Sequence, residues 1–144
     1  MAERERKEVR VSIQFDSDIQ DVYRYGVELF GEIAAKTFIA DIYSRIWSLD
    51  VMFGLHPESR FLVTKNKRYR NVILGSFLII YRINPGTVDV LRIIHSHSSI
   101  RKIRKTRKIH TWTAAISITS IHDLSIDILA QWPISALLIS KLAN

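Results

Sequence analysis

The stretch SFLIIYRINPGTVDVLRIIH, from Ser76 to His95, decides the fold of this chain. It holds two apolar runs rich in β-branched residues, joined by Asn84-Pro85-Gly86, and this pattern predicts a β-hairpin. Arg82 and Arg92 interrupt the two runs, although arginine is rarely buried in a sheet without a partner. We therefore expect each of these two arginines to have either a structural partner or a functional role.

A further strand is predicted directly before the hairpin, over residues 68–74, with Gly75-Ser76 as the turn. Residues 68–74, 77–83 and 87–95 then form a three-stranded antiparallel meander. The middle strand is apolar on both faces apart from Arg82, which predicts a central position in the sheet.

The first half of the chain predicts one strand and two helices. Residues 8–15 alternate apolar and polar side chains, as in a half-buried strand. Ser17-Asp18-Ile19-Gln20 fits a capping box that opens a helix, and Gly31 is expected to end it. A second helix is expected from Glu32, followed by a loop at 53–60. The predicted buried stripes are Ile19, Val22, Tyr23, Val27 and Phe30 in the first helix, and Ala35, Phe38, Ile39, Ile42, Ile46 and Leu49 in the second.

The predicted order of elements is therefore β-α-α-β-β-β. Because the link between the two helices is so short, they are expected to form an antiparallel αα-hairpin. The expected fold class is α+β: an N-terminal strand, the helical hairpin on one face of an antiparallel sheet, and then the meander.

Length and composition limit the possible classes of protein. The chain has 144 residues, of which 47% are hydrophobic, enough for one domain with a core. It has no cysteine, which excludes disulfides, thiolate nucleophiles and thiolate metal sites. The charged N-terminus lacks the apolar core of a signal peptide, and no apolar run is long enough for a membrane span. We expect a cytoplasmic protein that does not contact membranes.

The positive charge is concentrated in residues 1–110. This part holds 20 of the 21 Lys and Arg residues and 12 of the 14 Asp and Glu residues. Such an excess predicts a polyanionic partner, either nucleic acid or an acidic protein. Residues 100–109 repeat Ile-Arg-Lys with a period of three, which does not stay on one face of an α-helix. We expect a frayed helix or an extended arm that becomes ordered on its partner.

Residues 111–144 differ from the rest in composition, and we treat them as a C-terminal extension of the 1–110 domain. They show alternation of Ser, Thr and Ile at 115–121 and an apolar close at 134–142. Three roles stay open: packing on the domain, dimerisation, or no function.

Several features together resemble the RelE/ParE family, the toxins of type II toxin–antitoxin modules that include plasmid stabilisation proteins. They are the order of elements, the loop His56-Pro57, the strand Ile80-Tyr81-Arg82-Ile83 and the close Val90-Leu91-Arg92-Ile93-Ile94-His95. The resemblance covers about residues 8–105 and is closer to ParE than to RelE. It implies a cognate antitoxin as partner, bound in a hetero-oligomer, and no cofactor.

The family contains two mechanisms, which leaves the enzyme question open. ParE-like members inhibit DNA gyrase and need no catalytic set, whereas RelE-like members cut mRNA on the ribosome. We favour the ParE-like mechanism, because residues 98–110 contain no tyrosine of the kind that RelE-like sites place after the last strand. A third possibility is an inactive member that retains only antitoxin binding.

For a nuclease, the resemblance implies that cations and a proton-transferring histidine lie on the sheet. The candidate catalytic residues are then Arg70, Arg82, Arg92 and His95. The candidate contacts to a nucleic acid or another target are Lys67, Arg68, Arg101, Lys102, Arg104 and Lys105. No metal is expected, because His95 and His97 lack a third ligand nearby in the sequence.

The length of the hairpin loop decides between two environments for Arg82. With a four-residue loop, Arg82 lies across from Asp89 and forms an ion pair of about 0.2–1 kcal/mol. With a three-residue loop, it faces Val88 and shares a basic face with Arg92.

Overall fold

The computed structural model describes residues 5–109 and 116–117. Helices and strands appear in the predicted order, followed by two short helices and a two-residue strand. Their bounds are β1 (Glu8–Val11), α1 (Ile13–Phe30), α2 (Glu32–Met52), β2 (Tyr69–Leu74), β3 (Phe77–Ile83), β4 (Thr87–His95), α3 (Ile100–Arg104), the 3₁₀ helix η1 (Lys105–Lys108) and β5 (Ile116–Ser117). The α+β fold is confirmed.

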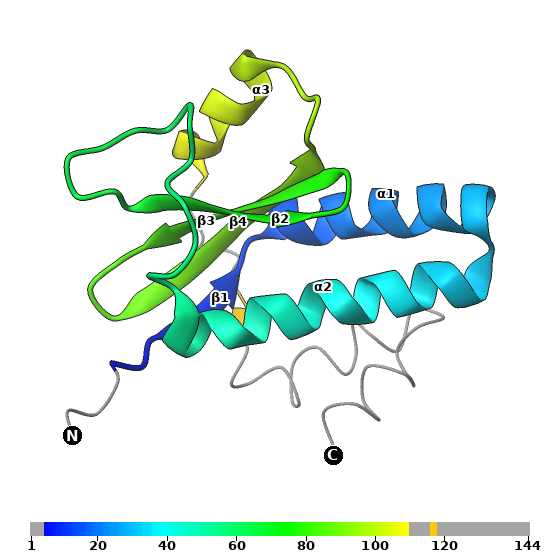
Figure 1. Cartoon of the computed structure of the whole chain (residues 1–144), viewed down its shortest axis with the longest axis horizontal. Coiled ribbons are helices and arrows are strands. Elements are labelled where there is room, and N and C mark those ends of the chain that lie inside the picture. The colour runs from blue at the N-terminus through cyan, green and yellow to red at the C-terminus, as the bar shows by residue number, and fades with distance from the viewer. Residues whose placement is uncertain (1–4, 110–115, 118–144) are drawn as a thin grey trace.

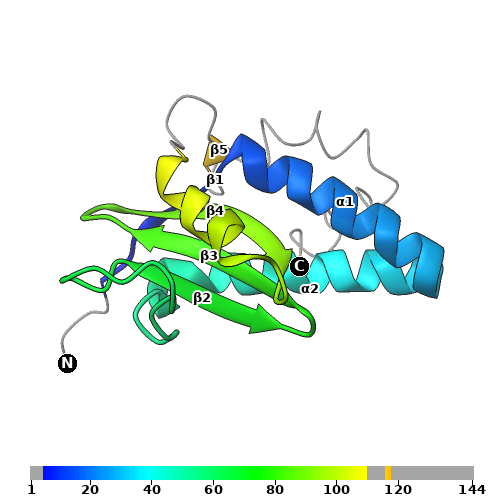
Figure 2. The ribbon, with the colours of Figure 1, turned by 90° about the horizontal axis from the view of Figure 1, so that it is seen from above.

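The strands form one sheet in the order β2-β3-β4-β1-β5. The meander β2-β3-β4 is antiparallel, as predicted, and β3 lies inside the sheet. However, β1 runs parallel to β4, so the sheet is mixed and the expectation of a purely antiparallel sheet is wrong. A parallel pair needs a crossover, which the helical hairpin supplies. Helices α1 and α2 cover one face of the sheet, and α3 lies on the other face (Figures 1 and 2).

The junction between β1 and α1 differs from the prediction. The strand ends at Val11, and Ser12 caps a helix that already includes residues 13–15. The Ser12 hydroxyl accepts a hydrogen bond from the Phe15 backbone N–H at 3.0 Å and donates to the Leu91 carbonyl at 2.6 Å. The capping box at Ser17 is therefore not used, because Ser12 has a partner in β4 that local sequence does not show.

The helical hairpin agrees with the prediction near the sheet and differs from it at the far end. Gly31, with a φ of 88°, ends α1, and its N–H donates to the Val27 carbonyl. The predicted buried face of α2 is confirmed at Ala35, Ile39, Ile42, Ile46 and Leu49, and Phe38 is partly buried. Phe30, expected in the buried stripe of α1, is 72% exposed because the far end of the hairpin projects beyond the sheet (Figure 1).

The sheet is covered on both faces, so β3 and β4 are apolar on both sides. The larger core lies between the sheet and the helical hairpin. A smaller core lies on the other face and consists of Leu62, Tyr69, Ile80, Leu91, Ile94 and Ile103. Both predicted hairpin strands, 77–83 and 87–95, have the observed bounds.

The basic repeat is folded, contrary to the expectation of a frayed helix or an extended arm. Ser99 caps α3, and Ile103 and Thr106 are buried against the sheet. Residues spaced by three drift around a long α-helix. Here one α-helical turn is followed by a 3₁₀ turn, which has three residues per turn, so residues three apart stay on one side. Ile103, Thr106 and the partly buried Ile109 therefore face the core, whereas Ile100 is 45% exposed and the Lys and Arg side chains face outward.

Two residues of the predicted extension lie within the described part. Ile116 pairs with Val11 and Ser117 with Arg10, antiparallel to β1. The apolar close at 134–142 and the predicted roles of the extension lie outside the described residues. Of the helices that the structure describes, none has the length and apolar character that a bilayer crossing requires.

Candidate functional site

Arg82 has a structural partner inside the sheet. It pairs with Asp89 across the hairpin, which confirms the four-residue loop, and its Nη2 lies 3.1 Å from Asp89 Oδ2. Asp89 is fully buried and also accepts from Arg10 Nε of β1 at 2.8 Å and from Asn84 Nδ2 at 2.7 Å. One carboxylate thus binds two guanidinium groups from two strands.

Arg92 points to the opposite side of the sheet from Arg82, because it lies three residues after Asp89, the cross-strand partner of Arg82, and successive side chains of a strand alternate between the two faces. Its Nε and Nη2 donate to the two carboxylate oxygens of Asp18 in α1, at 3.0 and 2.7 Å. Asp18 also accepts from the Ile93 backbone N–H at 3.2 Å. This is a bidentate pair between helix and sheet. The alternative in which Arg82 and Arg92 share one basic face is wrong.

Arg70 holds the loop between α2 and β2. Its guanidinium donates to the carbonyls of Lys67 at 2.7 Å, His56 at 2.8 Å and Gly54 at 3.2 Å. Burial, together with the positive charges of Arg45 and Arg70, lowers the pKa of His56 below its usual 6.5. This histidine is therefore neutral at physiological pH and lies edge-to-face on the Tyr81 ring, 6.1 Å away.

His95 is exposed at the end of β4, opposite Phe77 in the register. Its ring lies 5.4 Å from the Phe77 ring and 5.4 Å from the His97 ring. Within residues 5–109 and 116–117, no three His, Cys, Asp or Glu side chains are placed to hold a metal ion. Of the four candidate nuclease residues, three thus have separate structural partners, and only His95 is exposed.

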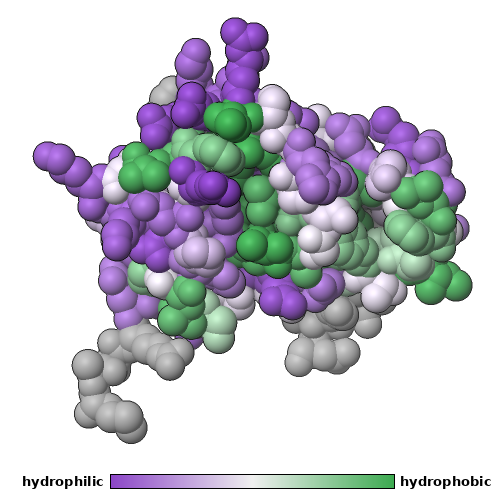
Figure 3. Space-filling view, turned by 45° about the horizontal axis from the view of Figure 1, so that its top comes forward, coloured by the Kyte–Doolittle hydropathy of each residue, from purple (hydrophilic) through white to green (hydrophobic). Residues whose placement is uncertain are grey.

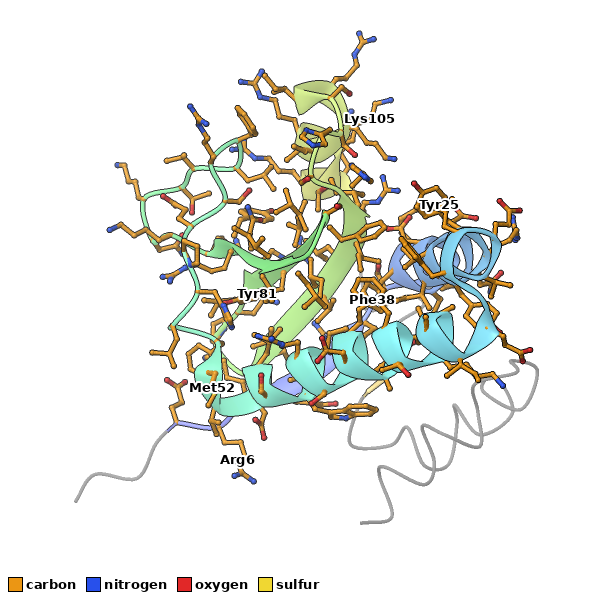
Figure 4. The ribbon with its side chains drawn as sticks, turned by 45° about the vertical axis from the view of Figure 1, so that its right-hand side comes forward. Arg6, Tyr25, Phe38, Met52, Tyr81 and Lys105 are labelled. Carbon is orange, nitrogen blue, oxygen red and sulfur yellow. The ribbon has the colours of Figure 1, made fainter. Side chains whose placement is uncertain are left out.

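An apolar groove lies between the far half of the helical hairpin and the turn from β2 to β3. It consists of two adjoining pockets of about 310 and 280 Å³ that share Val22, Tyr25, Phe77 and His95. Figure 4 shows Tyr25 on α1 and Phe38 on α2, on two sides of this region. We call it the hairpin groove and define it by Val22, Tyr25, Leu29, Phe38, Phe77 and His95.

Sequence reasoning missed most of the hairpin groove. Tyr25 and Leu29 are 50% and 54% exposed, and neither was placed in the predicted stripe of α1. The sequence does contain a signal for this surface: Tyr25 and Leu29 are large apolar residues that lie outside the predicted buried stripe of α1. A single exposed apolar residue is ordinary, but a group of them beside a pocket indicates a binding surface.

The predicted target contacts mostly lie on one surface. Arg101, Lys102, Arg104 and Lys105 are exposed on α3 and η1, on the side away from the sheet, where Figure 4 shows Lys105. Arg68 is the exception, since it is half-buried and donates to Asn84 Oδ1 at 2.6 Å. We call the exposed cations of this surface the basic ridge: Arg101, Lys102, Arg104, Lys105, Arg107 and Lys108.

The basic ridge continues onto the neighbouring loop. Arg107 Nη2 donates to the Val63 carbonyl at 3.3 Å, which places the end of the ridge beside the loop that carries Lys65 and Lys67. None of the six ridge residues forms an ion pair with any residue that the structure describes. Figure 3 shows hydrophilic surface over this side of the molecule and apolar surface at the far end of the helical hairpin.

The two halves of the described chain carry opposite charge. Residues 5–58 hold six Lys or Arg and ten Asp or Glu, whereas residues 59–109 hold thirteen Lys or Arg and a single carboxylate, Asp89. Because Asp89 is fully buried, the second half presents no exposed carboxylate. This arrangement can attract a polyanion over a continuous surface.

Comparison with known proteins supports a family assignment. Residues 9–100 match the family model described as the ParE toxin of the type II toxin–antitoxin system parDE. Among solved structures, the chain is similar to one titled "Chromosomal ParDE TA system from P. aeruginosa", with a TM-score of 0.54 and 18% identity over 63% of this chain and 97% of that chain. At that identity the likeness shows the fold alone. Among curated protein sequences there is no match.

Proposed function

We propose, from the premise that this chain belongs to the ParE toxin family of type II toxin–antitoxin systems, that it arrests growth by inhibiting DNA gyrase. The predicted resemblance to this family, closer to ParE than to RelE, is confirmed. We further propose that a cognate antitoxin neutralises the toxin in the cytoplasm.

The observation that carries the gyrase proposal is that the three candidate catalytic arginines are all bound by other groups of the protein. RNA cleavage needs cations that are free to stabilise the developing negative charge beside a proton donor and acceptor. Here Arg82 is bound to Asp89, Arg92 to Asp18, and Arg70 to three carbonyl groups. These contacts favour a structural role for each arginine and so favour the mechanism that needs no catalytic set.

The hairpin groove is the surface that we propose for the antitoxin. Its wall is apolar, with Tyr25 and Leu29 half-exposed, and a tyrosine that becomes buried in an apolar contact is among the residues that contribute most to the energy of protein interfaces. Its rim carries Asp21 and Lys102, so an amphipathic segment can place its polar side chains there. A segment seated in this groove covers apolar surface that the toxin otherwise leaves exposed.

Induced expression of the chain in a bacterial host, with a supercoiling assay using purified gyrase, tests the gyrase proposal. We expect growth arrest, filamentous cells, induction of the DNA-damage response and loss of supercoiling activity, with cellular transcripts intact. Rapid loss of translation with cut transcripts contradicts the proposal and indicates a nuclease; Arg82→Ala and His95→Ala should then abolish cutting. Normal growth with retained antitoxin binding indicates an inactive member.

The substitution Leu29→Asp tests the antitoxin surface. The probe is the small protein encoded by the neighbouring reading frame, titrated against the purified toxin. We expect its affinity to fall by at least about tenfold, because a carboxylate must be buried in an apolar contact. Ser44→Asp adds the same charge at an exposed position of α2 and should leave affinity unchanged. Equal affinities for both variants contradict the placement.

A further inference from the structure

We propose that the basic ridge, together with Lys65 and Lys67 of the adjoining loop, binds the phosphate backbone of double-stranded DNA without reading its sequence. The ridge presents six cations from nine consecutive residues of α3 and η1, and all six side chains are exposed. The hydrogen bond from Arg107 to the Val63 carbonyl joins the two segments into one surface.

The ridge is not needed to neutralise the chain's own acidic groups. Other arginines of the second half have partners, as Arg82 and Arg92 show. The ridge cations have no carboxylate within salt-bridge distance among the described residues, and they repel one another. The fold itself is anchored by Ile103 and Thr106, which face the core. A cluster of cations kept unpaired on a folded element indicates an anionic partner.

The composition of the ridge favours a phosphodiester backbone over an acidic protein. A protein interface has an apolar centre with aromatic anchors and a polar rim. The ridge residues are all Lys or Arg, with Ile100 as the exposed apolar residue beside them on α3, whereas the larger group of exposed apolar residues lies in the hairpin groove. Arginine and lysine together at short spacing are the residues that contact successive phosphates.

Duplex DNA is the form that the surroundings of the ridge favour. Proteins that bind single strands stack the unpaired bases on aromatic side chains. Residues 100–109 contain no aromatic residue, and Phe61 on the adjoining loop is partly buried in the smaller core. The preference for DNA over an RNA duplex rests on the proposed function, because gyrase acts on double-stranded DNA.

Binding of the purified full chain to a labelled duplex of about 25 base pairs, followed by fluorescence anisotropy at several salt concentrations, tests this inference without gyrase. The ridge variant carries R101Q, K102Q, R104Q and K105Q. We expect its affinity at about 100 mM salt to fall by at least about thirtyfold, and the slope of log K against log salt to become shallower by about 3 to 4.

A charge-matched variant controls for overall charge. It carries R6Q, R24Q, K36Q and R45Q, which remove four cations from exposed ion pairs of the first half. We expect its affinity to change by less than about threefold. Circular dichroism and thermal unfolding of both variants confirm that each is folded.

Two results with the DNA duplex overturn the inference: no binding by the unsubstituted chain at about 50 mM salt, and an equal loss of affinity in both variants. Two results with other probes also overturn it: tighter binding of single-stranded DNA or duplex RNA than of duplex DNA, and binding of a polyglutamate peptide of the same total charge as tight as that of the duplex. If DNA binding depends on the ridge but the chain does not inhibit gyrase, the DNA-binding inference is supported and the proposed gyrase inhibition is contradicted. Failure of the DNA-binding inference can therefore be distinguished from failure of the proposed function.

Discussion

Residues 5–58 and residues 59–109 arrange their charges differently. In the first half, acidic and basic residues are mixed on the helices and form surface pairs such as Arg24–Asp21, Lys36–Glu32 and Arg45–Asp41. In the second half, the single carboxylate is buried, and most cations have no acidic partner. The first half therefore presents mixed charges beside the apolar residues that it contributes to the hairpin groove, and the second half presents a basic surface.

This comparison separates two kinds of arginine that look alike in the sequence. Arg82 interrupts an apolar strand and is neutralised inside the fold, whereas Arg104 lies in a repeat and stays exposed. The presence of a partner, and not the unusual position in the sequence, decides which arginine is structural. Substitutions of paired and unpaired residues in the two halves test this division.

Asp89→Ala should have the largest effect on stability. It leaves the guanidinium groups of Arg10 and Arg82 without their shared carboxylate, and breaking a buried pair costs about 3–5 kcal/mol. Urea unfolding measures the change. Asp21→Ala breaks an exposed pair in the first half and should cost no more than about 0.5 kcal/mol. Similar losses in the two variants would show that Asp89 has no special structural role.

Arg92→Ala should cost less, about 2–3 kcal/mol, because it removes both hydrogen bonds to a mostly buried Asp18. The carboxylate of Asp18 retains only the Ile93 N–H as a partner. Thermal unfolding compares this variant with Arg45→Ala, whose pair is exposed. If Arg92→Ala is as stable as Arg45→Ala, the clamp between α1 and β4 contributes nothing.

Asp16 should make stability depend on pH. Burial raises its pKa from 3.8 to about 6, so the folded state holds a proton that the unfolded state releases. This contribution is present below pH 3.8 and is lost as the pH rises through about 6. Asp16→Asn should therefore stabilise the protein by about 1 kcal/mol at pH 7.5 and by almost nothing at pH 3.5. A gain of equal size at both pH values would contradict this sign.

His95→Ala should have the smallest effect. His95 is exposed at a strand end and contacts Phe77 and His97, so its removal should change stability by no more than about 0.5 kcal/mol. If the chain inhibits gyrase, growth arrest should persist in this variant. Loss of arrest with unchanged stability would restore the nuclease hypothesis for this residue.

The meander and the helical hairpin could be predicted because their signals are local. The apolar, β-branched runs at 77–83 and 87–95, bounded by the turns Gly75-Ser76 and Asn84-Pro85-Gly86, predict both strand bounds, and Gly31 ends α1 as expected. The start of α1 could not be predicted, because Ser12 is held in the capping position by a hydrogen bond to the Leu91 carbonyl, which lies 79 residues away in the sequence.

Partners of the candidate site residues were the harder part of the prediction. Asp89 is close to Arg82 in sequence, and a hairpin argument found it. Asp18 lies 74 residues from Arg92, and only the packing of α1 on the sheet brings them together. The hairpin groove depends on how far the helices project beyond the sheet, which periodicity does not encode.

The gyrase supercoiling assay, run with the unsubstituted chain, the ridge variant and the charge-matched variant, tests the central claim most directly. We expect the unsubstituted chain and the charge-matched variant to inhibit supercoiling equally, and the ridge variant to need at least about a tenfold higher concentration. Undisturbed supercoiling at every concentration of the unsubstituted chain, with growth arrest and cut transcripts in the same host, would contradict the account.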